Sequence, residues 1–374
     1  MGSIPANRAA RAYRGIDHKT EGNAMDGIVE TTAGRAVRGI ERRGLPVLDV
    51  GPALTGDKAA IRALSEQWRE VWETIGFMCI VNHGVPGEAI GRMEAEAKHF
   101  HDLSLDIKMS VSVTHDQKGY TPPHTATPTH SEFHDSRKLN TVECFVIATD
   151  FADDNPYVQA GEQFYGKMPW LPEDVLPGFR AAAETYMETV TALGKKLLPV
   201  WALSLDLPED YFQPMFEDSY TYFRMAKYAP KPDLEEGEMG VSAHADTGFM
   251  TFLPPANEEG LQVLDSDGTW FWPELPEGAL IVNAGQFLER WSNGRFRATP
   301  HRVVPPLEND RYSLACFVNP NFEAVGECLA TCTGPDNPPK YPAQTYREFF
   351  TWYMTNTFTH YGKLKDVDGE AVEA

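Results

Sequence analysis

Seven short apolar segments, each bounded by Gly, Pro, Asn or Asp, constrain the fold of this chain more than any other feature. They occupy residues 220–228, 249–253, 261–264, 269–271, 279–283, 301–304 and 312–319. Apolar segments of this length that end in turn residues predict β-strands. So many strands at close intervals favour two stacked sheets, arranged as a sandwich or a double-sheet barrel.

Helical periodicity flanks this strand-rich region. Apolar residues recur at steps of three or four in residues 57–74 and 172–205, and the longer stretch predicts a spine helix laid along a sheet. Residues 343–360 predict a C-terminal helix. We therefore predict a mainly β chain with flanking helices.

The domain prediction is a single domain over residues 45–360. Its N-terminal part (45–170) includes a Pro-rich, irregular region from residue 111 onward, and residues 171–360 hold the spine helix, the strands and the last helix. Residues 1–44 contain many Arg and small residues without apolar periodicity, so we expect a flexible extension there. Residues 361–374 are expected to be a flexible tail.

Charge and cysteine content exclude several functional classes. The formal net charge is −21, which is unsuited to phosphate backbones and anionic membranes, so no nucleic-acid or membrane partner is expected. No apolar run approaches the roughly 20 residues that span a bilayer. The five cysteines are few and scattered, which favours a cytoplasmic location over a disulfide framework. We expect a monomer or a weak dimer that binds a small-molecule substrate.

A candidate metal site begins at His244 and Asp246, two residues apart just before a predicted strand. In an extended backbone, residues i and i+2 point to the same face, so both side chains can bind one ion. His301, at the start of a later strand, is the candidate third ligand. Two His and one carboxylate bind one face of an octahedral iron and leave positions open. A closed structural zinc site needs a fourth protein ligand, for which no residue is well placed.

Arg311 and Ser313 follow ten and twelve residues after His301 and share a face of the last predicted strand. A guanidinium binds a carboxylate through two parallel hydrogen bonds, and a hydroxyl adds a third. An anion clamp beside an open iron site suggests a carboxylate co-substrate. Four further histidines have irregular spacing that argues against a second metal site: His115, His124, His130 and His134.

The ordered set of His244-Ala245-Asp246, His301 and Arg311-Tyr312-Ser313 resembles the signature of the 2-oxoglutarate/Fe(II)-dependent dioxygenases, in the isopenicillin N synthase-like branch. The resemblance covers about residues 45–360 and includes Val81-Asn82-His83-Gly84-Val85 and Gly260-Leu261-Gln262-Val263. It implies a distorted double-stranded β-helix (jelly roll) core with the spine helix outside.

Gln286 departs from the family, whose members usually have Asp after the corresponding Gly. We expect that position to be structural, without loss of activity.

The resemblance also implies the cofactors and their ligands. Fe(II) would be held by His244, Asp246 and His301. The far carboxylate of 2-oxoglutarate would meet Arg311 and Ser313, with help from Tyr228, although Ala226 replaces a co-substrate-binding Asn of some plant relatives. With O₂, and with ascorbate as a possible support, the enzyme would hydroxylate, desaturate or cyclise a small organic metabolite. Succinate and CO₂ would be released.

The substrate is less constrained. Candidates to bind its acid group are Tyr120, His130, Arg224 and Lys227, and candidates for the pocket wall are Phe317 and Asn319. We expect a small carboxylated or aromatic metabolite. Two alternatives remain open at this point. One is an isopenicillin N synthase-type iron oxidase that does not use 2-oxoglutarate, and the other is a non-catalytic barrel that binds a small ligand.

Overall fold

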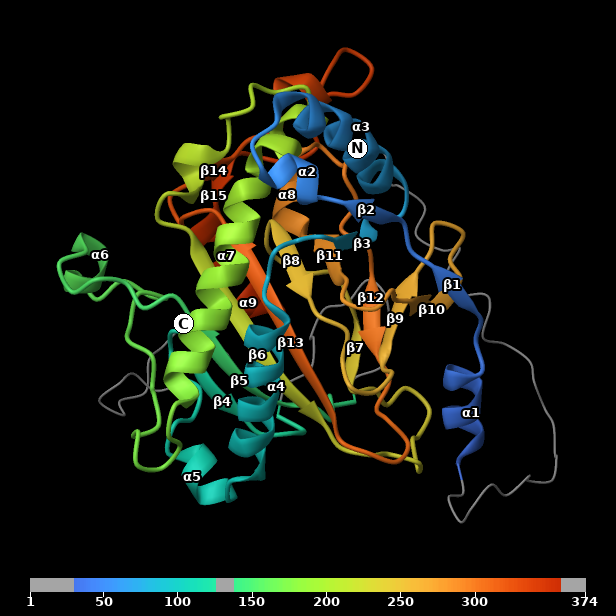
Figure 1. The fold of residues 1–374 in the computed structure, drawn as a ribbon, viewed down its shortest axis with the longest axis vertical. Helices are drawn as coiled ribbons and strands as arrows, with labels where there is room; N and C mark the ends of the chain where they lie inside the picture. Colours follow the sequence, from blue (N-terminus) through green and yellow to red (C-terminus); the bar gives the residue numbers. More distant parts are fainter. Residues whose placement is uncertain (1–29, 126–137, 358–374) are drawn as a thin grey trace.

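The computed structural model describes residues 30–125 and 138–357 and has a β core with helices packed around it (Figure 1). The helices are α1 (Thr32–Arg38), α2 (Gly51–Leu54), α3 (Lys58–Thr74), α4 (Gly87–Asp102), α5 (Leu105–Met109), α6 (Pro156–Gln159), α7 (Phe179–Ser204), α8 (Gln286–Trp291) and α9 (Tyr346–Thr357). The strands of the larger sheet, in spatial order, are β2 (Val47–Asp49), β3 (Phe77–Val81), β11 (Leu280–Ala284), β8 (Met250–Leu253), β13 (Arg311–Asn319), β6 (Tyr220–Tyr228), β5 (Glu143–Ala148) and β4 (Gly119–Thr121).

The smaller sheet has five strands and lies against the inner face of the larger one. Its spatial order is β1 (Arg42–Gly44), β10 (Trp270–Glu274), β9 (Leu261–Leu264), β12 (His301–Val303) and β7 (Val241–His244). Val241 and Val303 of this sheet pack against Ala226 and Tyr228 of the larger sheet. A short hairpin of β14 (Val325–Gly326) and β15 (Gln344–Thr345) completes the strands. The two facing sheets confirm the predicted jelly-roll core.

Alternation along β6 divides the larger sheet into two chemically different faces. Phe223 and Met225 point outward, where Phe223 packs edge-on against Tyr186 of α7. The alternate residues of β6, among them Arg224 and Tyr228, point into the space between the sheets. Figure 1 shows α4 and α7 crossing the outer face. The outer face therefore forms the main core, and the inner face is left for a ligand site.

The spine helix confirms the predicted long helix but begins later than expected, at Phe179 rather than at residue 172. Gly178, in the left-handed region with φ of 76°, precedes its first turn, and residues 173–178 form turns and a bend. Near its C-terminal end, Trp201 stacks on Trp72 of α3 with ring centroids 4.7 Å apart. Asp57 caps α3 by accepting hydrogen bonds from the backbone N–H groups of Ala59 and Ala60. These contacts fix the N-terminal helices to the core.

Residues 30–44 are not the flexible extension that the sequence predicted. They form α1 and then β1, which pairs in parallel with β10. Val37 of α1 packs on a small cluster of Leu234, Trp272 and Val304, and its carbonyl accepts a hydrogen bond from Gln262. The segment has too few apolar residues to show periodicity, and the residues that it contacts are distant in the sequence. The predicted flexibility of residues 1–29 and 361–374 concerns parts of the chain outside the described residues.

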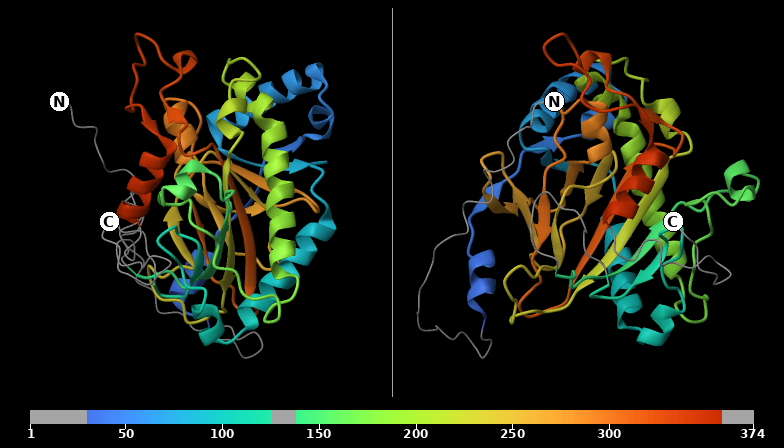
Figure 2. Two further views of the ribbon diagram at one scale, coloured as in Figure 1. Left: turned by 90° about the vertical axis from the view of Figure 1, so that its left-hand side faces the viewer. Right: turned by 180° about the vertical axis from the view of Figure 1, so that it is seen from behind.

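The views from the side and from behind show α9 on the opposite side of the sheet from α7 (Figure 2). Phe350 of α9 contacts the rings of Tyr220 and Tyr222 on β6. Helix α9 therefore covers one end of the inner face. Across residues 30–125 and 138–357, no helix combines the length and apolar character required to cross a membrane.

A charge introduced at Val37 tests the docking of α1. We expect Val37→Asp to lower the free energy of unfolding by about 1–3 kcal/mol, because it places a carboxylate against an apolar cluster. The matched control is Ala36→Asp on the exposed side of the same turn. Chemical denaturation measures both variants, and equal stabilities would contradict the docking of α1.

Candidate metal centre and adjoining cavity

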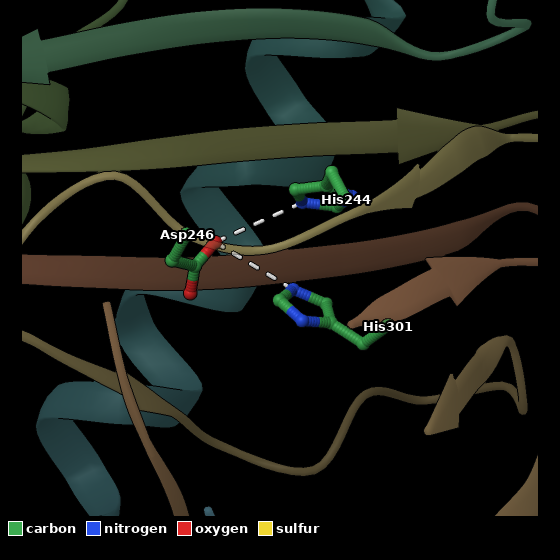
Figure 3. A group of neighbouring side chains, drawn as sticks. All are labelled: His244, Asp246 and His301. Carbon is green, nitrogen blue, oxygen red and sulfur yellow. Dashed lines mark ion pairs between the residues drawn. The ribbon is translucent and has the colours of Figure 1, made fainter. Parts of the chain in front are cut away.

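Strand pairing brings the two candidate histidines together. Strands β7 and β12 are antiparallel neighbours, and their register places His301 directly opposite His244. Asp246 lies in the turn just after β7. One ligand atom from each of the three residues lies within 4.8 Å of the others (Figure 3). In the described part of the chain, this is the one group of three or more His, Cys, Asp or Glu residues that is so arranged.

The backbone orients both imidazoles toward the same carboxylate oxygen. Nδ1 of His244 lies 2.9 Å from the carbonyl oxygen of Ser242, and Nδ1 of His301 lies 3.1 Å from that of Thr299. Because a carbonyl only accepts, each Nδ1 carries a proton, and in the neutral ring each Nε2 keeps a free lone pair. The two Nε2 atoms lie 3.7 Å and 3.5 Å from Oδ1 of Asp246. Three donor atoms therefore converge on one point.

The second oxygen of Asp246 is held away from this point. Thr251 Oγ1 and Asn283 Nδ2 each donate to Oδ2 at 2.6 Å. Although burial disfavours the carboxylate, His301, His244 and the Thr251 hydroxyl lower the pKa of Asp246 below its ordinary value. Burial, together with the neighbouring His301, lowers the pKa of His244 to about 3. A neutral imidazole and an ionised carboxylate are the forms that bind a metal, so this donor set fits a divalent ion.

A set of buried amides fixes the turn that carries Asp246. Gln286 donates from Nε2 to the carbonyl of Ala245 at 2.9 Å and from its backbone N–H to the carbonyl of Asp246 at 2.7 Å. Gln286 therefore supports the metal loop directly, which gives the expected structural role a physical basis. Asn319 Oδ1 accepts from the N–H of Phe249 at 2.9 Å, close against Gly248. The structure thus places Asn319 in this support and not in the substrate wall expected from the sequence.

The three residues expected to bind the co-substrate lie together on neighbouring strands. Arg311 pairs with Tyr228 across β13 and β6, and Ser313 lies two residues further along the same face. The guanidinium lies 5.0 Å from the Tyr228 ring, and its Nε donates to the carbonyl of Glu258 at 3.1 Å. Nη1 is buried and has no hydrogen-bond partner among the described residues. A buried guanidinium with an unpaired N–H is suited to bind an anion.

A cavity of about 90 Å³ adjoins the candidate metal ligands. His244 and Asp246 form part of its wall, as do Arg224 and Phe317, two of the expected substrate residues. Phe317 stacks on Tyr222 with ring centroids 4.5 Å apart. The remaining lining residues are Val113, Gln117, Thr121, Asn140, Val142, Cys144, Val146, Tyr220, Val241, Thr247, Phe350, Tyr353 and Met354. Most of the wall is therefore aliphatic or aromatic.

Two other expected substrate residues lie on the opposite face of the sheet. Tyr120 donates to Glu143 at 2.6 Å, and Lys227 pairs with Asp310 at 3.1 Å. Period-two alternation explains this placement, because a strand that points Arg224 and Tyr228 inward must point Lys227 outward. His130 lies outside the described residues. Gln117, which lines the cavity, was missed because it lies in a loop without periodicity.

Comparisons with known proteins agree with this geometry. Residues 219–320 match the family model for the 2OG-Fe(II) oxygenase superfamily, and residues 45–173 match that for the non-haem dioxygenase N-terminal region. The chain is 33% identical over 310 residues to a 2-oxoglutarate-Fe(II) type oxidoreductase of Emericella nidulans, covering 81% of this chain and 87% of the relative. It is 34% identical over 275 residues to azadirone synthase of Melia azedarach, covering 71% and 80%.

Solved structures show the same fold. A full-length Neurospora crassa protein in complex with alpha-KG and thymine superimposes with a TM-score of 0.71 at 22% identity, over 83% of this chain and 96% of that chain. The two-His-one-carboxylate geometry, the family models and the relatives above 30% identity lead to one conclusion. This chain belongs to the 2-oxoglutarate/Fe(II)-dependent oxygenase superfamily and is an oxidoreductase of that class.

Proposed function

We propose that the chain oxidises a small organic molecule in the cavity beside His244 and Asp246, with 2-oxoglutarate held by Arg311, Ser313 and Tyr228. The observation that carries this proposal is the free Nη1 of the buried Arg311, on the same inner face as the cavity that the triad adjoins. When bound, Fe(II) would supply the oxidising chemistry, with 2-oxoglutarate and O₂ as co-substrates and succinate and CO₂ as co-products. The protein orients both molecules and shields them.

Different residues of the site would bind the metal, the co-substrate and the substrate. His244, His301 and Oδ1 of Asp246 would hold the metal, and three protein ligands would leave it able to bind other molecules. The charged end of 2-oxoglutarate is placed by Arg311 and Ser313 on β13. The apolar cavity wall holds the substrate body and selects which carbon faces the iron. Hydroxylation, desaturation and ring closure are all compatible outcomes, since each begins at a carbon placed near the metal.

A small-molecule substrate is supported by the size of the cavity and by solved structures of the same fold. The Neurospora crassa protein was solved with thymine in addition to alpha-KG. The net charge of −21 supports the proposal that nucleic acid is not the substrate.

The five unpaired cysteines support a cytoplasmic location. A monomer or weak dimer remains our proposal for the oligomeric state.

An isopenicillin N synthase-type oxidase would use the same iron ligands without 2-oxoglutarate, but the names of the relatives favour the 2-oxoglutarate reaction. The two reactions differ in co-product. Succinate formed with Fe(II), ascorbate and O₂ supports our proposal. Failure of the protein to bind or consume 2-oxoglutarate with any substrate would contradict it.

Removing the metal-binding carboxylate tests the metal assignment. We expect the wild-type protein, mixed with Fe(II) and 2-oxoglutarate without oxygen, to develop a weak visible charge-transfer band. Asp246→Ala removes the one anionic ligand, so we expect neither stoichiometric iron nor the band. Elemental analysis and absorbance measure both. Wild-type iron content in this variant would refute the assignment.

The hydrogen bond from Thr251 to Asp246 gives a finer prediction. Thr251→Val keeps the shape of the side chain but releases Oδ2, so we expect Fe(II) affinity to fall about 10-fold or more. Thr185→Val on the exposed side of α7 is the matched control. Competition with a metal-binding dye measures both affinities. An unchanged affinity in the Thr251 variant would show that the bond does not orient the ligand.

Arg311→Gln tests the co-substrate clamp. Loss of a charge-assisted pair of hydrogen bonds should weaken 2-oxoglutarate binding by about 10- to 100-fold. Arg62→Gln on the exposed face of α3 provides the same chemical change far from the site. Anaerobic titration of the charge-transfer band gives both dissociation constants. Equal constants for this variant and the wild type would exclude Arg311 as the anion-binding residue.

A further inference from the structure

A second guanidinium lines the cavity and is not used by the co-substrate clamp. Arg224 lies on the inner face of β6, where its neighbours are Val146 of β5 and Ala315 of β13. Tyr228, the partner of Arg311, is four residues further along β6. At about 3.3 Å per residue the two positions are roughly 13 Å apart. The backbone positions of Arg224 and Arg311 are therefore well separated on the inner face.

Arg224 has a cavity in front of it and lacks a counter-ion. Its side chain is only partly accessible, and the Cys144 thiol lies beside it. Within the described residues, no Asp or Glu forms an ion pair with it. A partly desolvated guanidinium that faces a cavity and has no carboxylate partner is suited to bind an anion.

Gln117 provides an independent second observation on the same cavity. Its side chain is 8% exposed, and the amide Nε2 is buried without a hydrogen-bond partner among the described residues. Its backbone has φ of 59°, a left-handed conformation that costs a non-glycine residue about 1–3 kcal/mol. A buried amide N–H₂ that has no acceptor is a donor for a ligand oxygen.

The neighbouring residues hold Gln117 in this strained position. Its N–H donates to the carbonyl of Thr114, and the N–H of Thr114 donates to the carbonyl of Lys118. Lys118 is fully buried, and its Nζ donates to the carbonyls of Thr149 at 2.8 Å and Gly166 at 2.5 Å. A buried lysine thus ties the loop to two other segments. Gln117 therefore lines the cavity from a segment that is held at several points.

We propose that Arg224 and Gln117 together form a carboxylate-binding subsite, and that the substrate is a small carboxylic acid with an apolar or aromatic body. The guanidinium supplies the charge and the amide supplies a further donor. The apolar body lies against Phe317 and Tyr222, whose stacked rings form part of the cavity wall. This inference rests on the proposed function, because it takes this cavity as the substrate site.

The experiment compares acids with their neutral amides in protein already loaded with Fe(II) and saturating 2-oxoglutarate, without oxygen. Saturation with 2-oxoglutarate prevents probe acids from binding at Arg311. The probes are a panel of aliphatic and aromatic monocarboxylates, headed by 3-phenylpropanoate, each paired with its primary amide. Calorimetry measures the dissociation constants. We expect acids that bind to do so about 10- to 100-fold more tightly than their amides.

Variants assign this preference to the two residues. We expect Arg224→Gln to abolish it and Arg224→Lys to retain it in reduced form. Gln117→Glu should weaken binding of the acids but not of the amides, because it adds a carboxylate facing the ligand. The matched control, Arg62→Gln, should behave as the wild type. If Arg224→Gln does not fold, as judged by thermal unfolding, the lysine and Gln117 variants carry the test.

The possible failures are distinguishable. If the charge-transfer band forms but no acid of the panel binds, or amides bind as tightly as acids, the subsite is refuted and the proposed function stands. A preference for acids that survives in both Arg224→Gln and Gln117→Glu also refutes the subsite. If the band does not form, the proposed function fails. The titrations are then repeated on metal-free Arg311→Gln protein, where a loss of acid preference on Arg224→Gln would still support the subsite.

Discussion

The structure of the site depends on the different contacts that the two carboxylate oxygens of Asp246 make. Oδ2 accepts hydrogen bonds from Thr251 and Asn283, and this leaves Oδ1 facing the two imidazoles. Without these donors the carboxylate could rotate or bind through both oxygens. Thr251 and Asn283 lie on adjacent central strands of the larger sheet, so the metal-binding geometry is anchored in the most buried part of the β core.

Side chains on β6 point alternately outward and inward, so the strand contributes both to the core and to the site. Its outward residues pack against α4 and α7 and fix the strand, whereas its inward residues carry Arg224 and Tyr228. The rigid outer packing keeps the inward-facing Arg224 in place, and the neighbouring β13 does the same for Arg311. Two separated guanidiniums on one inner face fit the proposed binding of two anions, a co-substrate and a carboxylic acid.

Much of the fold could be predicted because its signals are local. The strand at residues 220–228, the spine helix and the pairing of His244, Asp246 and His301 as ligands all follow from periodicity and residue chemistry. The inward and outward residues of β6 could also have been separated, since Tyr228 and Lys227 cannot share a face. The segment around α1 could not be predicted. Its order depends on contacts with Leu234, Trp272 and Val304, which lie about 200 residues or more away in the chain.

The sequence by itself determined the class of chemistry, because metal ligands and anion clamps are defined by residue type and order. It also determined most of the elements that carry them. Only the tertiary structure decided that Asn319 and Gln286 support the metal loop, and that Lys227 faces away from the cavity that Arg224 lines. The strained Gln117 was likewise revealed only by the structure. The physical reason is that a side chain's role at a site depends on which distant backbone groups satisfy its hydrogen bonds.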